Sequence, residues 1–289
     1  MAEAEFENIL YEVRDGVAHI VLNRPEKLNA MGMGPGSSRD EIARALEAAS
    51  DDPGVGAALI SANGRAFCGG GDLSRSAART VPETPLDHLA FNQEVMRFNA
   101  RLRAVPIPVI AAVHGLCLGT ALGFISQLDF VIASDDARFG LIEGRIGHPG
   151  ASDLVPVIGL AWTKFLIFTG ELIDARRAER IGLVLTVVPS DALRGRATEL
   201  AERIARMPRE ALALNKLCLE NLAEASGRAA GRLVGRAHDS ITKAMTSAAR
   251  APDGRFFEEI LKTEGMKGLK AARSQQYEGP WLEPLSDGD

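Results

Sequence analysis

The sequence predicts an α/β fold that continues into a helical C-terminal part, because three patterns follow one another along the chain. Short β-branched runs such as VAHIVL at 17–22 and PIPVIAAV at 106–113 are typical of buried strands. Glycine-rich turns and amphipathic segments follow these runs, in the alternation that builds α/β domains. After residue 190 the strand-like runs stop, and apolar residues recur with helical spacing up to about residue 272.

Each predicted element has its own local signal. Apolar or β-branched runs predict strands at 17–22, 55–61, 106–113, 128–134 and 183–188. Helical spacing predicts helices at 87–104, 119–127, 153–169 and 174–181. Ser38 and Glu41 stand at the spacing of a capping box, which predicts a further helix from there to about Ala49. Breaks are expected near Pro208, Gly227 and Pro252, so we divide the chain into a core of residues 1–190 and a helical region of residues 191–289.

Composition and charge exclude several classes of function. The chain has 289 residues and a formal net charge of −5, which argues against a nucleic-acid groove. Three cysteines provide neither a disulfide framework nor the ligand spacing of a metal site, so no metal is expected. No apolar run is long enough to span a membrane, and the first residues lack the apolar core of a signal peptide. We therefore expect a cytoplasmic protein that binds no membrane.

Three glycine-rich turns each follow a predicted strand, in GRAFCGGGDL (64–73), HGLCLGTALG (114–123) and FGLIEGRIGHPG (139–150). None has the spacing of a dinucleotide-binding turn or of a P-loop. A glycine turn at the start of a helix nevertheless exposes backbone N–H groups that bind anions. Two such turns facing each other would hold one negative oxygen between two N–H donors, as acyl-transfer chemistry requires.

Four stretches in this order resemble the crotonase superfamily, the enoyl-CoA hydratase/isomerase family. They are NRPEKLNA (23–30), GRAFCGGGDL (64–73), IPVIAAVHGLCLGTALG (107–123) and DARFGLIEGRIG (136–147). RRAERIGLVLTVVP (176–189) and EGMKGLKAAR (264–273) extend the likeness over nearly the whole chain. The resemblance implies a spiral of ββα units, a helical C-terminal trimerisation region, a coenzyme A thioester as substrate, and a homotrimer or a dimer of trimers. It implies no cofactor beyond the coenzyme A that belongs to the substrate.

The resemblance also carries functional residues over to positions of this chain. It implies that the backbone N–H groups of Gly71 and Thr120 form an oxyanion hole. It places coenzyme A near Lys27, Leu28, Ala30, Ala66, Asp72, Leu73 and Ser74. Hydratases of the family carry two glutamates, of which this chain keeps Glu143 but has Gly123 at the other position. Because a double-bond shift needs one acid–base group, a lone Glu143 favours isomerisation and leaves hydration possible.

Other interpretations stay open at this point. His148 and Asp153 could face the acyl pocket, where Asp153 would replace the missing carboxylate, or Asp153 could cap the helix that follows it. Cys68 and Cys117 adjoin the two glycine turns, and we expect them to be buried packing residues rather than nucleophiles. The alternatives to enoyl-CoA chemistry are another crotonase-fold reaction (thioester hydrolysis, C–C cleavage or dehalogenation) and non-catalytic binding of acyl-CoA.

Overall fold

A central six-stranded sheet organises the chain in the computed structural model, which describes residues 6–73, 84–147, 152–245, 249–275, 277, 279–283 and 285. Its strand order is β1-β2-β3-β4-β6-β9. The bounds are β1 (Ile9–Arg14), β2 (Val17–Leu22), β3 (Ala57–Ala62), β4 (Val109–Val113), β6 (Phe130–Ser134) and β9 (Thr186–Val188). β1 runs antiparallel to β2, and the other neighbours are parallel. The sequence predicted each of these strands except β1.

A second, three-stranded sheet lies beside the first and has the order β5-β7-β8. It consists of β5 (Leu116–Leu118), β7 (Arg138–Gly140) and β8 (Leu172–Asp174). Gly115 lets the chain turn from β4 into β5, because its φ is +56° and a Cβ there would lie 2.3 Å from the carbonyl oxygen of Arg65. An isolated β-bridge between the backbones of Cys68 and Cys117 pairs the loop around Cys68 with β5. This backbone pairing joins the GRAFCGGGDL segment to the second sheet.

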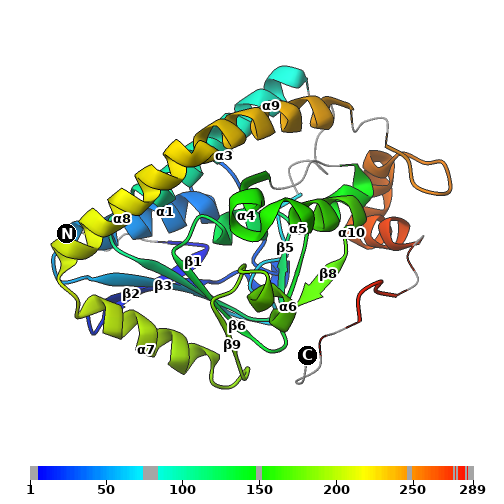
Figure 1. Ribbon diagram of the computed structural model, residues 1–289. Helices are drawn as coiled ribbons and strands as arrows, with labels where there is room; N and C mark the ends of the chain where they lie inside the picture. The colour runs from blue at the N-terminus through cyan, green and yellow to red at the C-terminus, as the bar shows by residue number, and fades with distance from the viewer. Residues whose placement is uncertain are drawn as a thin grey trace.

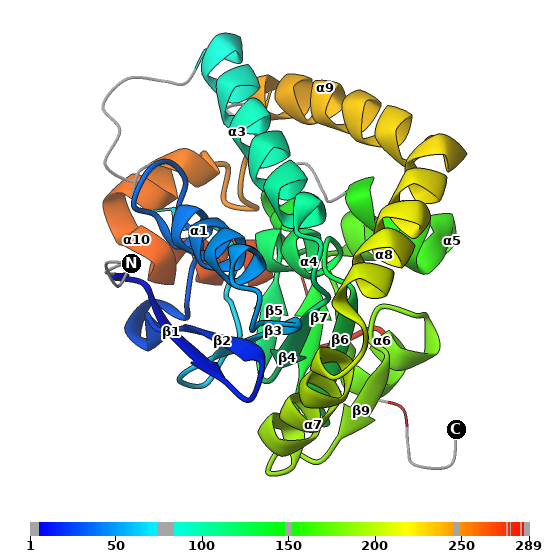
Figure 2. The ribbon, with the colours of Figure 1, turned by 90° about the vertical axis from the view of Figure 1, so that its left-hand side faces the viewer.

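Helices cover both faces of the central sheet (Figures 1 and 2). They are α1 (Ser38–Asp51), α3 (Pro85–Ala104), α4 (Thr120–Ile125), α5 (Val155–Thr169), α6 (Ala175–Arg180) and α7 (Leu193–Ala205). Alternate strand residues face opposite ways: Ile20 and Ile60 pack in the core that includes α1, whereas Leu59 packs against α7. No described helix has the length and apolar character needed to cross a membrane.

Two of the last described helices, α8 and α9, form an arm along the body of the molecule. α8 (Arg209–Ala223) passes through a π-helical turn (Glu224–Arg228) into α9 (Ala229–Met245), and α10 (Phe257–Ser274) follows. Gly227, with φ +102°, makes the bend between α8 and α9. In Figures 1 and 2, α9 lies alongside α3 above the sheet. The breaks predicted near Pro208, Gly227 and Pro252 are confirmed, because each lies at or between helix ends.

One local prediction is wrong by a residue. α1 is capped by Ser37, whose Oγ accepts a hydrogen bond from the backbone N–H of Asp40 (3.4 Å), and not by Ser38. The Ser38 hydroxyl instead accepts from the backbone N–H of Gly32 (3.3 Å), which fastens the preceding loop to the helix. Glu41 accepts from the backbone N–H of Asn8 (2.8 Å), so its carboxylate binds β1's leading segment instead of completing a capping box.

Candidate active site

The NRPEKLNA turn folds onto the glycine loop through backbone hydrogen bonds. The N–H of Gly69 donates to the carbonyl of Leu28 (2.8 Å), and the N–H of Met31 donates to the carbonyl of Gly70 (2.8 Å). The N–H of Asp72 then donates to the carbonyl of Met31 (3.0 Å). These bonds bring together the two segments to which the resemblance assigned coenzyme A, although they are about 40 residues apart in the sequence.

Two residues that the sequence analysis missed hold this arrangement. Arg24 forms an ion pair with Asp72 (Nη2 to Oδ2, 3.1 Å) and donates to the carbonyl of Ala30 (3.2 Å). Asn29 is buried with φ +53°, accepts from the backbone N–H of Arg24 (2.8 Å) and donates to the carbonyl of Ala66 (3.0 Å). The available signal was an asparagine in a turn, since asparagine tolerates left-handed backbone better than most residues do.

The remaining residues assigned to coenzyme A differ in exposure. Lys27 is exposed at the end of a short 3-10 turn, Pro25–Lys27. Leu28, Ala30 and Leu73 are half-buried, and Ala66 is buried. Ser74 and His148 lie outside the residues that the structure describes. The turn therefore presents one exposed cation beside a largely apolar surface.

The two predicted oxyanion positions lie close together. Gly71 pairs with Met31 in a short parallel bridge, and Thr120 begins α4 directly after β5. A Cβ added to Gly71 would lie 3.5 Å from Oγ1 of Thr120, which is van der Waals contact. The N–H of Thr120 has no intrahelical partner and faces the carboxyl of Glu143.

The carboxylate of Glu143 is packed against the second glycine turn. Glu143 lies in the 3-10 turn Ile142–Ile146 that follows β7. A Cβ at Gly119 would lie only 1.4 Å from Oε1 of Glu143, so the carboxylate occupies space that any other residue at 119 would fill. A Cβ at Gly70 would lie 3.8 Å from the same oxygen. Glycines from both turns therefore lie against this carboxylate. Gly119 not only makes the bend that the sequence indicates but also leaves the space that the carboxylate occupies.

The environment of Glu143 favours its protonated form. Among the described residues, its Oε2 is buried without a hydrogen-bond partner. Burial raises the pKa of Glu143, while the backbone N–H groups of Glu143 and Thr120 and the charge of Arg273 oppose this rise. A carboxyl group with a raised pKa, next to backbone N–H donors, can both accept and return a proton.

Asp153 has a different environment from Glu143. Its carboxylate is 2% exposed and forms an ion pair with Arg236 of α9 (Oδ2 to Nη2, 2.5 Å). The helix cap that was one alternative is not formed, because Leu154 is the N-cap of α5 and makes no side-chain cap bond. Asp153 also lines a cavity of about 110 Å³ together with Ser126, Gln127, Pro156, Val157, Ala223, Arg228 and Arg232.

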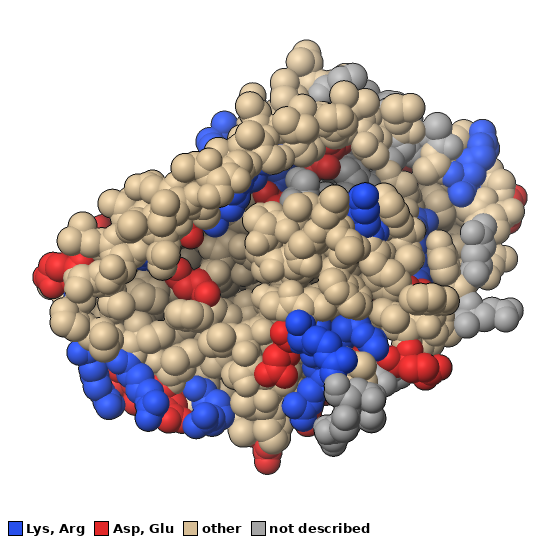
Figure 3. Space-filling view, in the orientation of Figure 1, with Lys and Arg blue, Asp and Glu red and all other residues tan. Residues whose placement is uncertain are grey.

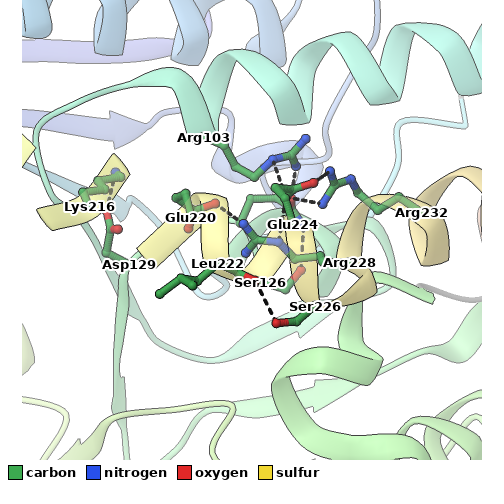
Figure 4. Close-up of polar contacts among 11 residues, drawn as sticks. Arg103, Ser126, Asp129, Lys216, Glu220, Leu222, Glu224, Ser226, Arg228 and Arg232 are labelled. Carbon is green, nitrogen blue, oxygen red and sulfur yellow. Dashed lines mark hydrogen bonds and ion pairs between the residues drawn. The ribbon is translucent and has the colours of Figure 1, made fainter. Parts of the chain in front are cut away.

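A cluster of arginines and glutamates borders this cavity (Figure 4). Its members are Arg103, Glu220, Glu224, Arg228 and Arg232. Glu224 accepts from Arg228 Nε (2.8 Å) and from Arg232 Nη1 (2.8 Å), and Arg103 reaches it from α3 (4.0 Å). The bond from Arg232 is the main reason that the pKa of Glu224 is lowered. Figure 3 shows a hollow with charged side chains below the ridge of α8 and α9. Because both glutamates are paired with arginines across the bend, we interpret this cluster as an ion-pair network that holds the α8–α9 bend.

The cysteines beside the glycine turns are confirmed as buried packing residues. Cys68 and Cys117 are both free and fully buried. Burial raises the pKa of the Cys68 thiol to about 11, and burial also raises the pKa of Cys117. A thiol with a raised pKa is a poor nucleophile at neutral pH, which leaves Glu143 as the group suited to proton transfer in this part of the chain.

Comparison with known proteins shows which family the chain is similar to. The sequence pattern of the family described as Enoyl-CoA hydratase/isomerase matches residues 12–264. The chain is 35% identical to a probable enoyl-CoA hydratase of Mycobacterium tuberculosis, over 76% of this chain and 84% of that protein. It is 34% identical to the 2,3-dehydroadipyl-CoA hydratase of Escherichia coli, over 71% and 78%. An enoyl-CoA hydratase/isomerase structure from Xanthobacter autotrophicus superposes with a TM-score of 0.86 at 30% identity, covering 95% of this chain and 100% of that one.

Proposed function

The chain belongs to the enoyl-CoA hydratase/isomerase family and has the crotonase fold, and on this premise we propose that it shifts the double bond of an enoyl-CoA thioester with Glu143 as its single acid–base group. The observation that carries the proposal is the buried carboxyl of Glu143, packed on Gly119 beside the N–H of Thr120. Its raised pKa suits a group that must take up a proton and give it back.

The proposed reaction is a 1,3-proton shift. Glu143 removes a proton from C2 of a 3-enoyl-CoA, and the electron pair moves toward the thioester oxygen. The N–H groups of Gly71 and Thr120 stabilise this enolate oxygen, by about 3 kcal/mol for each donor. Glu143 then returns the proton at C4, and the double bond lies between C2 and C3. No other acid is required, because the same carboxyl, once protonated, delivers a proton at C4, and it exchanges its proton with solvent between turnovers.

Coenzyme A is proposed to lie against the joined turn and glycine loop. Lys27, Leu28, Ala30, Ala66, Asp72, Leu73 and Ser74 are the residues assigned to it. The exposed ammonium group of Lys27 suits an ion pair with a phosphate. Its apolar neighbours suit contact with the flat adenine ring and with the extended pantetheine chain. Arg24 and Asn29 hold these segments together.

Hydration is the second candidate, and the names of the relatives favour it. The proteins of M. tuberculosis and E. coli cited above are both named as hydratases. Against hydration stands the absence of a second acid at Gly123, in α4, because water must be deprotonated while C2 is protonated. Asp153 does not replace that acid readily, since its Oδ2 is bound to Arg236.

The proposed oligomer is a homotrimer or a dimer of trimers that uses the helical C-terminal region. Exposed apolar side chains on α8 and α9 support it, namely Leu214, Leu217, Leu219, Leu222, Leu233, Val234, Ile241 and Met245. A concentration of exposed apolar side chains of this kind marks a protein interface more often than free surface. The cytoplasmic location and the division at residues 190 and 191 stay predictions.

The test is to incubate the protein separately with 2-enoyl-CoA and 3-enoyl-CoA of equal chain length and to quantify all products by mass spectrometry. Isomerisation predicts interconversion of the two enoyl-CoA species without net uptake of water. Dominant formation of 3-hydroxyacyl-CoA would establish hydration instead. If neither substrate turns over, nor any member of a broad thioester panel, the proposal is wrong.

A further inference from the structure

Arg39 is a buried arginine without a carboxylate partner. It is the second residue of α1 and is only 5% exposed. Among the described residues, its Nε has no hydrogen-bond partner, and no carboxylate lies within ion-pair distance of it. Its guanidinium contacts uncharged groups instead. Nη1 contacts the sulfur of Met33, and the guanidinium lies 5.7 Å from the ring centroid of Phe98.

The start of α1, which carries Arg39, is tied to the loops of the candidate active site. The Ser38 hydroxyl ties the start of α1 to Gly32, and the neighbouring Met31 pairs with Gly71 of the glycine loop. The Cys68 thiol, in the same loop, interacts electrostatically with both Arg39 and Glu143, although burial dominates its pKa. Arg39 and the carboxyl of Glu143 are therefore both within electrostatic reach of Cys68.

The other well-buried arginines near this region have carboxylate partners. Arg236 binds Asp153 (2.5 Å), Arg145 binds Glu171 (2.9 Å), and Arg232 binds Glu224. In each of these three cases an acidic side chain compensates the charge of the arginine, and the ion pair joins two elements of the fold. Arg39 is the exception among them.

The charges that act on Arg39 do not remove its need for an anion. Burial lowers the pKa of Arg39 to about 10, so the side chain stays protonated at neutral pH. Besides Cys68, the charge of Arg236 opposes that of Arg39 and the charge of Glu94 favours it, but neither residue forms an ion pair with it. A desolvated charge of this kind destabilises a fold unless something compensates it, and a ligand that arrives with the opposite charge would do so.

We propose that Arg39 binds an anionic group of the substrate, so that the preferred thioester carries a carboxylate at the far end of its acyl chain. This inference rests on the proposed function, because it assumes that acyl-CoA is the ligand of the site. The ring of Phe98 in α3 lies 5.7 Å from the guanidinium and gives this position an apolar side. A guanidinium suits a carboxylate because its planar fork offers two parallel N–H donors.

The first experiment measures binding without turnover. Saturated acyl-CoA thioesters of five to eight carbons are titrated calorimetrically in matched pairs, one ending in a methyl group and the other in a carboxylate. At the best-fitting length we expect the carboxylate form to bind about 100-fold more tightly to the wild-type protein. Arg39→Met should abolish this preference, whereas Arg39→Lys should keep part of it.

The matched control is Arg44→Met on the same helix, because Arg44 is half-exposed and lies over the ring of Phe6. We expect this variant to keep the carboxylate preference within two-fold. Wild-type protein that binds the methyl form equally or better at every length overturns the inference. An equal loss of affinity for both forms in Arg39→Met also overturns it. The wild-type comparison decides even if Arg39→Met fails to fold.

The second experiment repeats the pairs with the corresponding enoyl-CoA substrates. The kcat/KM of Arg39→Met should fall about 100-fold for the carboxylate substrate and stay within three-fold for the methyl substrate. Turnover of both substrates without this selective loss overturns the inference and leaves the proposed function standing. Absence of any turnover overturns the proposed function, while the binding preference still decides the inference.

Discussion

Glu143 and Asp153 are buried carboxylates ten residues apart, and their surroundings differ in one respect. Asp153 has a cation at 2.5 Å, supplied by Arg236 of α9. Glu143 has glycine backbone and two N–H groups around it, and no ion pair among the described residues. A paired carboxylate fixes the positions of two elements. An unpaired one keeps a raised pKa and can exchange a proton, so the pairing rather than the burial distinguishes the candidate catalytic group.

The largest effect is expected from Glu143→Gln. This change keeps the size of the side chain and removes its acid–base chemistry, so kcat should fall about 1,000-fold with nearly unchanged affinity for coenzyme A thioesters. Steady-state kinetics and calorimetric binding measure the two quantities. An unchanged kcat would show that Glu143 is no more catalytic than Asp153.

Gly119→Ala tests whether the space beside Glu143 is required. The added Cβ would overlap the carboxylate, and the backbone at φ +55° and ψ −118° strains any residue with a side chain. We expect kcat to fall on the order of 100-fold, because a small displacement of a catalytic group has that effect. Thermal unfolding should also begin at a lower temperature.

The matched control for this variant is Gly195→Ala in α7, where an added Cβ meets no atom within 4 Å. It should leave kcat unchanged and stabilise the protein by up to about 1 kcal/mol. Equal activity of the two variants would contradict the packing of Glu143 on Gly119.

Asp153→Asn should affect stability rather than catalysis. It leaves Arg236 with Asp239 as its remaining partner at 3.3 Å, so we expect a loss of about 2 kcal/mol, below the usual cost of breaking a fully buried pair. Chemical denaturation measures this loss, and kcat should stay within three-fold of the wild-type value. A decrease in kcat as large as that of Glu143→Gln would make Asp153 a second catalytic acid and restore hydration as the favoured reaction.

The smallest effect is a pH dependence that follows from the raised pKa of Glu143. As the base, Glu143 must be ionised, so kcat/KM should fall with decreasing pH around a pKa above the ordinary value of 4.5. Its contribution to stability is present below 4.5 and is lost as the pH rises through the raised pKa, because the fold then contains the desolvated charge. The stability advantage of Glu143→Gln over wild type should therefore grow with pH, and a constant difference would contradict this.

The sequence predicted those features that depend on residues close together in the chain. Strand runs and glycine turns predicted the sheet and the breaks between C-terminal helices, and ordered motifs indicated the family. Pairings between distant segments could not be predicted, because Asp153 and Arg236 are 83 residues apart and nothing local links them. The same holds for Gly119, which looks like an ordinary turn until Glu143 is seen to lie against it. Arg39 is indistinguishable by sequence from the solvated arginines of other helices, and only its burial without a partner sets it apart.

The most direct test of proton transfer by Glu143 is the incorporation of deuterium from D₂O into the substrate. Wild-type protein and Glu143→Gln are incubated with a 3-enoyl-CoA in D₂O, and NMR measures deuterium at C2 and C4 over time. The account predicts exchange at C2 by the wild-type protein and a rate at least 100-fold lower for the variant. Exchange at the wild-type rate in Glu143→Gln would contradict it.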